Sequence, residues 1–402
     1  MKKDNTNKYN NKRAKILFKG IVPSFLGIFI PKNKKRIIFN STRNEFYNFN
    51  TKYLFEYFIK NHPEYESKYV INNKEKRDKL NKEFGKEHEY FIETESFKGM
   101  WYALRAKSWI TSAFETPVGG FFLNLNRFVF LLGHGTHFKA IVLNENSLPM
   151  IKKIYYNLIL FNFSKFLVTS KSLIDIYKKA YRCDESKLAI LGEPRHDSIF
   201  EAKLSIIEEN FGEEVLLEKN VLYAPTWRPN SILKLFPFDE MSWSDFSDYL
   251  EKERINLYLR MHPSFPEDLS FYTNQSKRIK ILDNTIVEDI SDVMGFFDLL
   301  ITDYSSIHIS FLLLEKPVMF LPYDFKEYNE RMGFIDDYDK LTPGPKPTTL
   351  KRFQDEMKLL LENENYYKDE RVKVSYFFND FTHNNCKMNA EYIIKELEKK
   401  DA

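Results

Sequence analysis

The stretch Asp298-Leu299-Leu300-Ile301-Thr302-Asp303-Tyr304-Ser305-Ser306 joins a short apolar run to a turn of small polar residues. An apolar run without polar alternation is typical of a strand in a parallel sheet that helices cover on both faces. Strand and helix patterns alternate along the chain, which predicts an α/β fold. Ten further runs of this kind occur, at Arg36–Asn40, Tyr69–Asn72, Ser108–Thr111, Phe128–Leu132, Phe166–Thr169, Leu188–Leu191, Val221–Ala224, Asn256–Leu259, Ile279–Leu282 and Pro317–Leu321.

A charged segment of helical pattern, from Glu201 to Asn220, separates the first six runs from the last five. This break predicts two similar α/β halves, residues 36–205 and 206–385, with a cleft between them. A basic and apolar segment, residues 1–35, precedes the halves, and a charged amphipathic helix, residues 386–402, follows them. The length of 402 residues suits this organisation, because domains average roughly 150 residues.

The composition is that of a globular protein, with 43% hydrophobic and 29% charged residues. No run approaches the ~18 apolar residues that a membrane-spanning helix needs. The only two cysteines, Cys183 and Cys386, are far apart in the sequence. Their number excludes a disulfide scaffold and a cysteine-rich zinc site, and it fits a reducing cytoplasm.

The N-terminal segment differs in charge from the rest of the chain. Residues 1–36 hold eleven Lys or Arg and one acidic residue, a net charge of +10, whereas the remainder has a net charge of −7. Basic side chains beside the apolar residues 21–30 favour a helix that lies on an anionic membrane surface, where each cation adds ~1 kcal/mol. A solvated tail is the alternative. Because the body is acidic and has no basic stripe, we expect no nucleic-acid partner.

Polar residues gather directly after five of the predicted strands, where ligands bind in an open parallel sheet. These strand ends supply Arg, His, Ser, Thr and Gly and few acidic residues, an inventory that suits a ligand with phosphate groups. The five segments are Gly133 to Lys139, Gly192 to Asp197, Pro225 to Arg228, Arg260 to Pro263 and Asp303 to Ser306.

Several of these residues have a clear chemical reason to bind an anion. Ser305 and Ser306 begin a predicted helix, where unpaired backbone N–H groups favour negative charge. Arg228 and Arg260 have planar guanidinium groups that suit phosphate oxygens. Simple N-capping of the helix by Asp303 or Ser305 is the alternative for this turn, and an ordinary surface ion pair is the alternative for each arginine.

Two histidines, His134 and His262, follow strands and face the predicted cleft. His134 lies between two glycines, where the backbone can turn tightly and approach a ligand. An imidazole with a pKa near ~6.5 can accept a proton at neutral pH. A histidine that only completes a turn is the alternative.

Four motifs are absent from the places where they would carry chemistry. Because there is no GxGxxG and no GxxxxGK[ST], dinucleotide and Walker-type phosphate sites are unsupported. No Asp-x-Asp follows a strand as a metal-nucleotide clamp would, and no GxSxG elbow occurs. We therefore expect no metal ion and no cofactor.

In this order and at these strand ends, the sequence resembles the CDP-glycerol glycerophosphotransferase family, the enzymes that build teichoic acids and related capsular polymers. The resemblance runs from about residue 36 to residue 350. It rests on His134-Gly135-Thr136 with Lys139, Gly192-Glu193-Pro194-Arg195-His196-Asp197, Tyr223-Ala224-Pro225-Thr226-Trp227-Arg228, Arg260-Met261-His262-Pro263 and Ile301-Thr302-Asp303-Tyr304-Ser305-Ser306.

The resemblance implies a GT-B fold, in which two Rossmann-like domains face each other and the second holds most of the nucleotide-linked donor. It implies that His134 is the catalytic base and that the enzyme is cytoplasmic and peripheral at the inner face of the cell membrane. The residues that we expect to bind the CDP-linked donor are Gly135, Thr136, Arg195, Pro225, Thr226, Arg228, Arg260, Met261, His262, Asp303, Ser305, Ser306 and Ser310.

The sequence departs from the family pattern at two places. His137 and Phe138 stand where the family usually has Pro-Leu, and Ser310 stands where it usually has an acidic residue. The expected reaction is transfer of a polyol phosphate, glycerol phosphate first, to a hydroxyl of a lipid-linked or oligosaccharide acceptor, with release of CMP. A GT-B glycosyltransferase that uses a nucleotide sugar and a non-catalytic membrane-docked scaffold are the alternatives.

Overall fold

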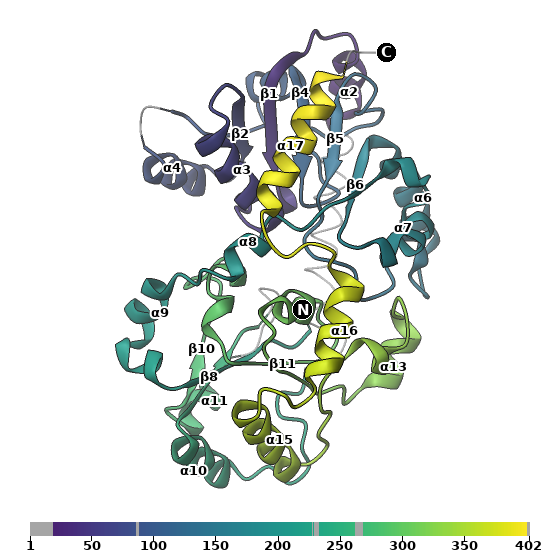
Figure 1. Ribbon diagram of the computed structural model, residues 1–402. Helices are drawn as coiled ribbons and strands as arrows, with labels where there is room; N and C mark the ends of the chain where they lie inside the picture. The colour runs from purple at the N-terminus through teal and green to yellow at the C-terminus, as the bar shows by residue number, and fades with distance from the viewer. Residues whose placement is uncertain (1–18, 86–87, 227, 229–232, 262–267, 400–402) are drawn as a thin grey trace.

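Two parallel sheets organise the chain in the computed structural model, which describes residues 19–85, 88–226, 228, 233–261 and 268–399 (Figure 1). The seven-stranded sheet has the order β3-β2-β1-β4-β5-β6-β7, and the five-stranded sheet has the order β10-β9-β8-β11-β12. The strands are β1 (Asn33–Asn40), β2 (Glu66–Val70), β3 (Phe91–Ile92), β4 (Ala106–Thr111), β5 (Phe128–Leu131), β6 (Lys165–Val168), β7 (Leu188–Ile190), β8 (Lys219–Tyr223), β9 (Ile255–Leu259), β10 (Ile279–Ile281), β11 (Leu299–Thr302) and β12 (Val318–Phe320).

The α/β prediction is confirmed, and each of the eleven predicted runs coincides with a strand. The sequence reading missed β3, because two residues at the edge of a sheet leave no run to detect. We call the seven-stranded sheet with its helices the first unit, and the five-stranded sheet with its helices the second unit.

Both faces of each sheet are buried, which explains the uninterrupted apolar runs. In β1, Ile37 and Phe39 pack into one cluster, and Ile38 packs into the cluster on the opposite face. The helices are α2 (Ile21–Gly27), α3 (Phe49–Asn61), α4 (Lys74–Glu83), α5 (Phe97–Leu104), α6 (Met150–Ile159), α7 (Ile174–Tyr181), α8 (His196–Ile199), α9 (Leu204–Phe211), α10 (Trp243–Glu253), α11 (Ser270–Gln275), α12 (Ile307–Phe311), α13 (Phe325–Arg331), α14 (Tyr338–Leu341), α15 (Leu350–Glu362), α16 (Lys368–Phe378) and α17 (Asn385–Glu398).

The C-terminal part of the chain returns to the first unit. Figure 1 shows α15 on the second unit and α17, in yellow, on the first, with α16 between them. Cys386, Ala390 and Ile393 of α17 are buried in the same cluster as Phe55 and Phe58 of α3. The last helix therefore completes the helical layer of the first sheet.

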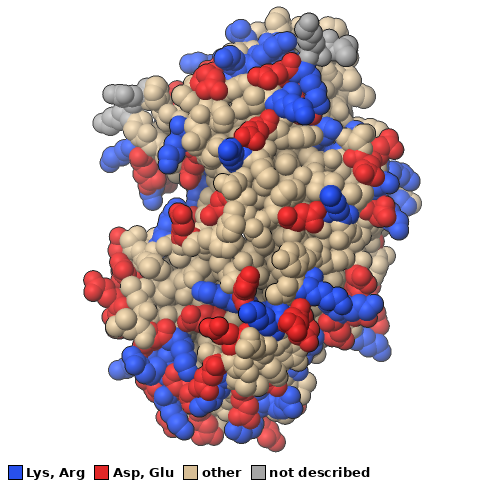
Figure 2. Space-filling view, in the orientation of Figure 1, with Lys and Arg blue, Asp and Glu red and all other residues tan. Residues whose placement is uncertain are grey.

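The two units contact each other through polar side chains as well as apolar ones. Lys52 of α3 forms an ion pair with Asp292 of the second unit at 2.5 Å, and both side chains are buried. Tyr53 donates its hydroxyl to the same carboxylate at 3.1 Å. Figure 2 shows the surface indented between the units on the side of α4 and α9. In the described part of the chain, no helix is long and apolar enough to cross a membrane.

Candidate active site

Strand ends from both units meet where Gly135, Arg195 and Ser306 lie close together. A Cβ atom placed on Gly135 would lie 3.1 Å from Nη2 of Arg195 and 3.4 Å from Oγ of Ser306. Gly135 follows β5, Arg195 follows β7, and Ser306 follows β11 of the other sheet. The φ of Gly135 is +147°, so a larger residue would be strained there and would also collide with its neighbours. The structure thus joins three of the residues predicted to form the site.

The loop that carries His134 is fastened to the first unit by Asn50 of α3. The side-chain amide of Asn50 donates to the carbonyls of Leu132 at 3.3 Å and Gly133 at 3.1 Å. Its oxygen accepts the backbone N–H of Arg195 at 3.3 Å. One buried amide therefore links the segments that follow β5 and β7, and it positions both the loop of His134 and the backbone of Arg195.

His134 keeps its side chain exposed while the loop beneath it is fixed. Its Nδ1 lies 3.4 Å from the carbonyl oxygen of Ser112, and its ring centroid lies 5.5 Å from that of Phe49. Although His134 is exposed, neighbouring protein atoms displace part of the water around its ring, which lowers the pKa of His134 from its ordinary value, and the nearby Arg195 acts in the same direction. A neutral imidazole open to solvent can accept a proton.

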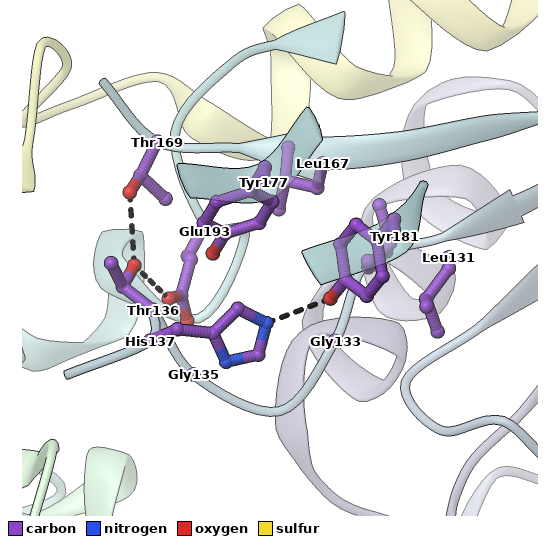
Figure 3. Close-up of a pocket in the computed structure, with 11 residues that line it drawn as sticks. Leu131, Gly133, Gly135, Thr136, His137, Leu167, Thr169, Tyr177, Tyr181 and Glu193 are labelled. Atoms are coloured by element: carbon purple, nitrogen blue, oxygen red, sulfur yellow. Dashed lines mark hydrogen bonds between the residues drawn. The ribbon is translucent and has the colours of Figure 1, made fainter. Parts of the chain in front are cut away.

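Glu193 and Thr136 form a buried network behind this loop (Figure 3). Thr136 donates its hydroxyl to Glu193 at 2.7 Å, and its Oγ1 lies 3.0 Å from Oγ1 of Thr169. Burial alone would raise the pKa of Glu193, but the guanidinium of Arg195 lowers it to about 2. Thr136 therefore points into the protein, and its role is to hold the loop.

Arg195 links this network to the second unit. Its Nε donates to Glu193 at 2.5 Å, and its Nη2 donates to Oγ of Ser310 at 2.9 Å. Nε2 of His196 lies 3.0 Å from the same hydroxyl, and burial lowers the pKa of His196 to about 4. Ser310, at the position where the family usually has an acidic residue, thus joins α12 to two residues of the first unit.

Asp303 and Arg228 form a second, fully buried cluster. Asp303 accepts the backbone N–H of Thr226 and the Nη1 of Arg228, both at 2.8 Å. Arg228 also donates to both carboxylate oxygens of Asp324, at 2.6 and 2.8 Å, and to the carbonyl of Thr226 at 2.6 Å. With its side chain buried and these donors engaged, Arg228 holds the turn after β8, and its contact with a donor phosphate stays a prediction.

The turn after β11 leaves Ser305 and Ser306 half-buried. The helix that they precede, α12, has only five residues, so the dipole argument for an anion site is weaker than the sequence suggested. Ser306 makes no side-chain cap bond to this helix, whereas the Oγ of Ser305 accepts the backbone N–H of Ile307 at 3.4 Å, a long bond of the capping kind. The Oγ of Ser306 faces Gly135 across the junction between the units.

Arg260 lies apart from the contacts described above. It donates to the carbonyls of Leu282 at 3.2 Å and Glu288 at 3.3 Å, and it is half-buried. Desolvation lowers its pKa to about 10, so the side chain is cationic at neutral pH. Pro225 and Met261 are buried beside the strand ends, whereas His262 and Trp227 lie outside the described residues.

Sequence reasoning missed Phe49 and Asp289, which complete the surroundings of His134. The backbone N–H of Phe49 donates to the carboxylate of Asp289, in the second unit, at 2.7 Å. Phe49 has a φ of +58°, a left-handed conformation that costs energy in a residue with a side chain. Neither residue belongs to a recognisable motif, and only the fold brings them together.

Within the ranges that the structure describes, no three His, Cys, Asp or Glu side chains are grouped so that they could hold a metal ion. The polar groups at the site are instead cations, hydroxyls and one exposed imidazole. They suit an anionic ligand and a proton transfer.

The sequence model of the CDP-glycerol:poly(glycerophosphate) glycerophosphotransferase family matches residues 24–399. The teichoic acid poly(glycerol phosphate) polymerase of Bacillus spizizenii is 26% identical over 401 residues, which cover 94% of this chain and 95% of that protein. The teichoic acid poly(ribitol-phosphate) polymerase of the same organism is 30% identical over 225 residues, 54% of this chain, but the match covers only 35% of that longer protein.

Solved structures share the fold. A histidine-to-asparagine variant of the wall teichoic acid polymerase TagF, soaked with CDPG, has a TM-score of 0.73 at 21% identity, with 98% of each chain covered. A putative UDP-N-acetylglucosamine 2-epimerase from Listeria monocytogenes has a TM-score of 0.57 at 14% identity, with 92% of this chain and 98% of that chain covered. These likenesses confirm the two-unit GT-B arrangement. With the match over residues 24–399, the chain belongs to the CDP-glycerol:poly(glycerophosphate) glycerophosphotransferase family.

Proposed function

We propose that the protein transfers glycerol phosphate from CDP-glycerol to a hydroxyl of a teichoic-acid-like or capsular acceptor and releases CMP. The observation that carries this proposal is the meeting of His134 and Gly135 of the first unit with Ser306 of the second. A base for the acceptor hydroxyl and groups for the donor phosphates then lie on opposite sides of one junction. Family membership supports the reaction class.

In this reaction the acceptor oxygen attacks the phosphorus that carries glycerol, and the bond from that phosphorus to the oxygen of CMP breaks. The carbonyl of Ser112 can only accept a hydrogen bond, so Nδ1 of His134 carries the hydrogen. Nε2 is then free to take the proton of the attacking hydroxyl. CMP leaves as a phosphate, so its departure needs charge stabilisation more than an acid.

Two cations are placed to supply that stabilisation. Arg195 lies beside Gly135, and Arg260 remains charged at the end of β9. Ser305 and Ser306 add half-buried hydroxyls at the end of β11. Transfer of a phosphoryl group depends mostly on positioning and charge, so these residues need only be held in place. We assign Thr136, Arg228 and Asp303 to positioning of the two turns.

Identification of the released nucleotide tests the proposal. The purified protein is incubated with CDP-glycerol, CDP-ribitol and a panel of nucleotide sugars, each with a lipid-linked acceptor. We expect CMP from CDP-glycerol, together with transfer of labelled glycerol phosphate to the acceptor. Release of a nucleoside diphosphate from a nucleotide sugar would contradict the proposal and identify a glycosyltransferase. If no nucleotide is released from any donor, the result would favour the alternative of a non-catalytic, membrane-docked scaffold.

We further propose that the enzyme works at the inner face of the cell membrane, with the segment before β1 on an anionic lipid surface. Helix α2 exposes Val22, Phe25 and Leu26, and Phe29 directly after it is 74% exposed. Helix α5 packs beside α2 and exposes Phe97 and Trp101, whose rings stack. Apolar side chains next to lysines suit the boundary between headgroups and acyl chains.

Sedimentation with lipid vesicles tests this membrane contact. We expect the full chain to bind phosphatidylcholine vesicles that contain phosphatidylglycerol more strongly than vesicles of phosphatidylcholine alone. The double variant Phe25→Ser, Phe29→Ser should lose most of the binding. Leu217→Ser is the matched control, because Leu217 is 83% exposed on the second unit. Equal binding by the double variant and the wild type would contradict the contact.

A further inference from the structure

The loop from Gly133 to Ala140 is attached to both units, although it begins in the first. After His134 and His137 it runs alongside residues 333–335 of the second unit. The carbonyl of Phe138 accepts the N–H of Ile335 at 3.2 Å, and the N–H of Ala140 donates to the carbonyl of Gly333 at 3.1 Å. Lys139 and Phe334 form an antiparallel bridge between these bonds. The loop of the candidate base is therefore also a contact between the units.

Phe138 inserts its ring among aromatic side chains of the second unit. It is 1% exposed, and its ring centroid lies 4.6 Å from that of His308, 5.0 Å from Phe334 and 5.9 Å from Tyr338. The ring meets His308 edge to face, and it is tilted against Phe334 and Tyr338. Aromatic pairs at such distances stabilise beyond the area they bury. The Phe138 side chain thus adds an apolar anchor to the backbone bonds between the loop and the second unit.

Two of the rings around Phe138 hold the turn after β11. Nδ1 of His308 donates to the carbonyl of Ser305 at 2.7 Å. The hydroxyl of Tyr338 donates to the carbonyl of Asp303 at 3.0 Å. Phe138 is therefore one contact away from the backbone that presents Ser305 and Ser306, and it lies four residues after His134 in the sequence.

The other side of the loop is fixed in the first unit. His137 places Nε2 2.7 Å from the hydroxyl of Tyr181, and Thr136 bonds to Glu193 (Figure 3). The protein around His137 removes water from its ring and lowers its pKa to about 3, so this contact keeps one protonation state at neutral pH. With both ends held, the separation between His134 and the turn at Ser305 is set largely by where Phe138 seats.

We propose that Phe138 is a positioning residue, which fixes the distance between the base on the first unit and the phosphate-binding turn on the second. This inference rests on the proposed function. It assigns a role to the position where the sequence departs from the family pattern. Removal of the ring leaves Thr136 and His137 to hold the loop in the first unit, and it leaves His308 and Tyr338 to hold the turn. The backbone bonds to residues 333–335 also remain, so the variant removes only the packing of the ring against the side chains that hold the turn.

The test measures steady-state turnover of CDP-glycerol by Phe138→Ala and Phe138→Leu. We expect Phe138→Ala to lower kcat by about 10- to 100-fold, the range that loss of alignment at a reacting centre produces, with KM for the donor changed less than about threefold. Phe138→Leu, which refills much of the pocket, should recover most of the turnover. If Phe138→Ala does not fold, Phe138→Val replaces it.

The pH profile separates positioning from stability. Charged groups near the ring of His134 are Arg195, Glu193 and Glu115. None is removed by the variant, but a looser loop weakens both the packing around the imidazole and its repulsion from Arg195, the two effects that lower its pKa. The acid limb of kcat/KM should therefore move to higher pH in Phe138→Ala, toward the ordinary histidine value.

Phe353→Ala is the matched control, because Phe353 is equally buried in the second unit and packs on Phe238 and Phe246, away from the loop. We expect it to lower the unfolding temperature but to leave kcat and the acid limb unchanged. The inference is overturned if the wild type releases CMP and Phe138→Ala does so at the same rate, or if Phe353→Ala loses as much turnover. The absence of CMP release by the wild type would instead overturn the proposed function.

Discussion

The loop that carries His134 and the turn that carries Asp303 both follow a strand of a parallel sheet, but they use their polar side chains differently. His134 is exposed, and Ser306 of the other unit faces the neighbouring Gly135 and makes no side-chain cap bond to its own helix. Asp303 and Arg228, in contrast, are buried and satisfy each other with Thr226 and Asp324. Open groups are available to a ligand, whereas groups with all their partners in the protein hold the backbone that presents them. Arg195 lies between these cases, because it bonds to Glu193 and Ser310 but also borders Gly135 at the junction.

The largest expected effect comes from a substitution of the exposed residue His134. His134→Ala should lower kcat by about 10²–10⁴, the usual contribution of a general base, because no other imidazole among the described residues occupies the same exposed place. Affinity for CDP, measured by calorimetry, should stay near that of the wild type. A variant with nearly normal turnover would show that His134 is not the base.

In the buried cluster of Asp303 and Arg228, the substitution Arg228→Met should lower the free energy of unfolding. It leaves the carboxylates of Asp303 and Asp324 without their cation, and loss of one partner of a buried ion pair costs about 3–5 kcal/mol. Urea unfolding measures this cost. If the variant is as stable as the wild type but binds CDP poorly, Arg228 contacts the donor, and the division between the two regions is wrong.

Arg260 is the matched arginine for that experiment. Its two long hydrogen bonds to carbonyls contribute little to stability, so Arg260→Met should unfold at nearly the urea concentration of the wild type. Loss of a charged hydrogen bond to the donor costs about 1.5–3 kcal/mol, which weakens CDP binding by about 10- to 150-fold. Calorimetry checks the affinity, and an unchanged dissociation constant would remove Arg260 from the site.

The last expected effect is the pH dependence that Glu193 contributes. Its pKa is about 2 in the folded protein against 4.5 ordinarily, so its stabilising contribution is complete above pH 4.5 and is lost as the pH falls toward 2. Glu193→Gln should be less stable at pH 7, and its stability should fall less steeply between pH 4.5 and 2. Urea midpoints at a series of pH values test this, and parallel curves for the two proteins would contradict it.

The sequence predicted the strands, the two units and the residues that meet at Gly135, because apolar runs and strand-end motifs are local features. It could not predict the ion pair of Arg228 with Asp324, since Asp324 lies 96 residues away in the sequence and only the fold brings the two side chains together. It could not find the left-handed Phe49 or its partner Asp289, which have no local signature. It could not give the length of the helix after Ser306, whose α-helical part ends at Phe311.

A crystal structure of His134→Ala with CDP-glycerol tests the central claim most directly, namely that one site is built from both units. The account predicts that the donor phosphates lie within hydrogen-bond distance of Arg195 and Ser306, with the phosphorus that carries glycerol facing position 134. A donor bound by the second unit alone, with position 134 far from that phosphorus, would contradict it.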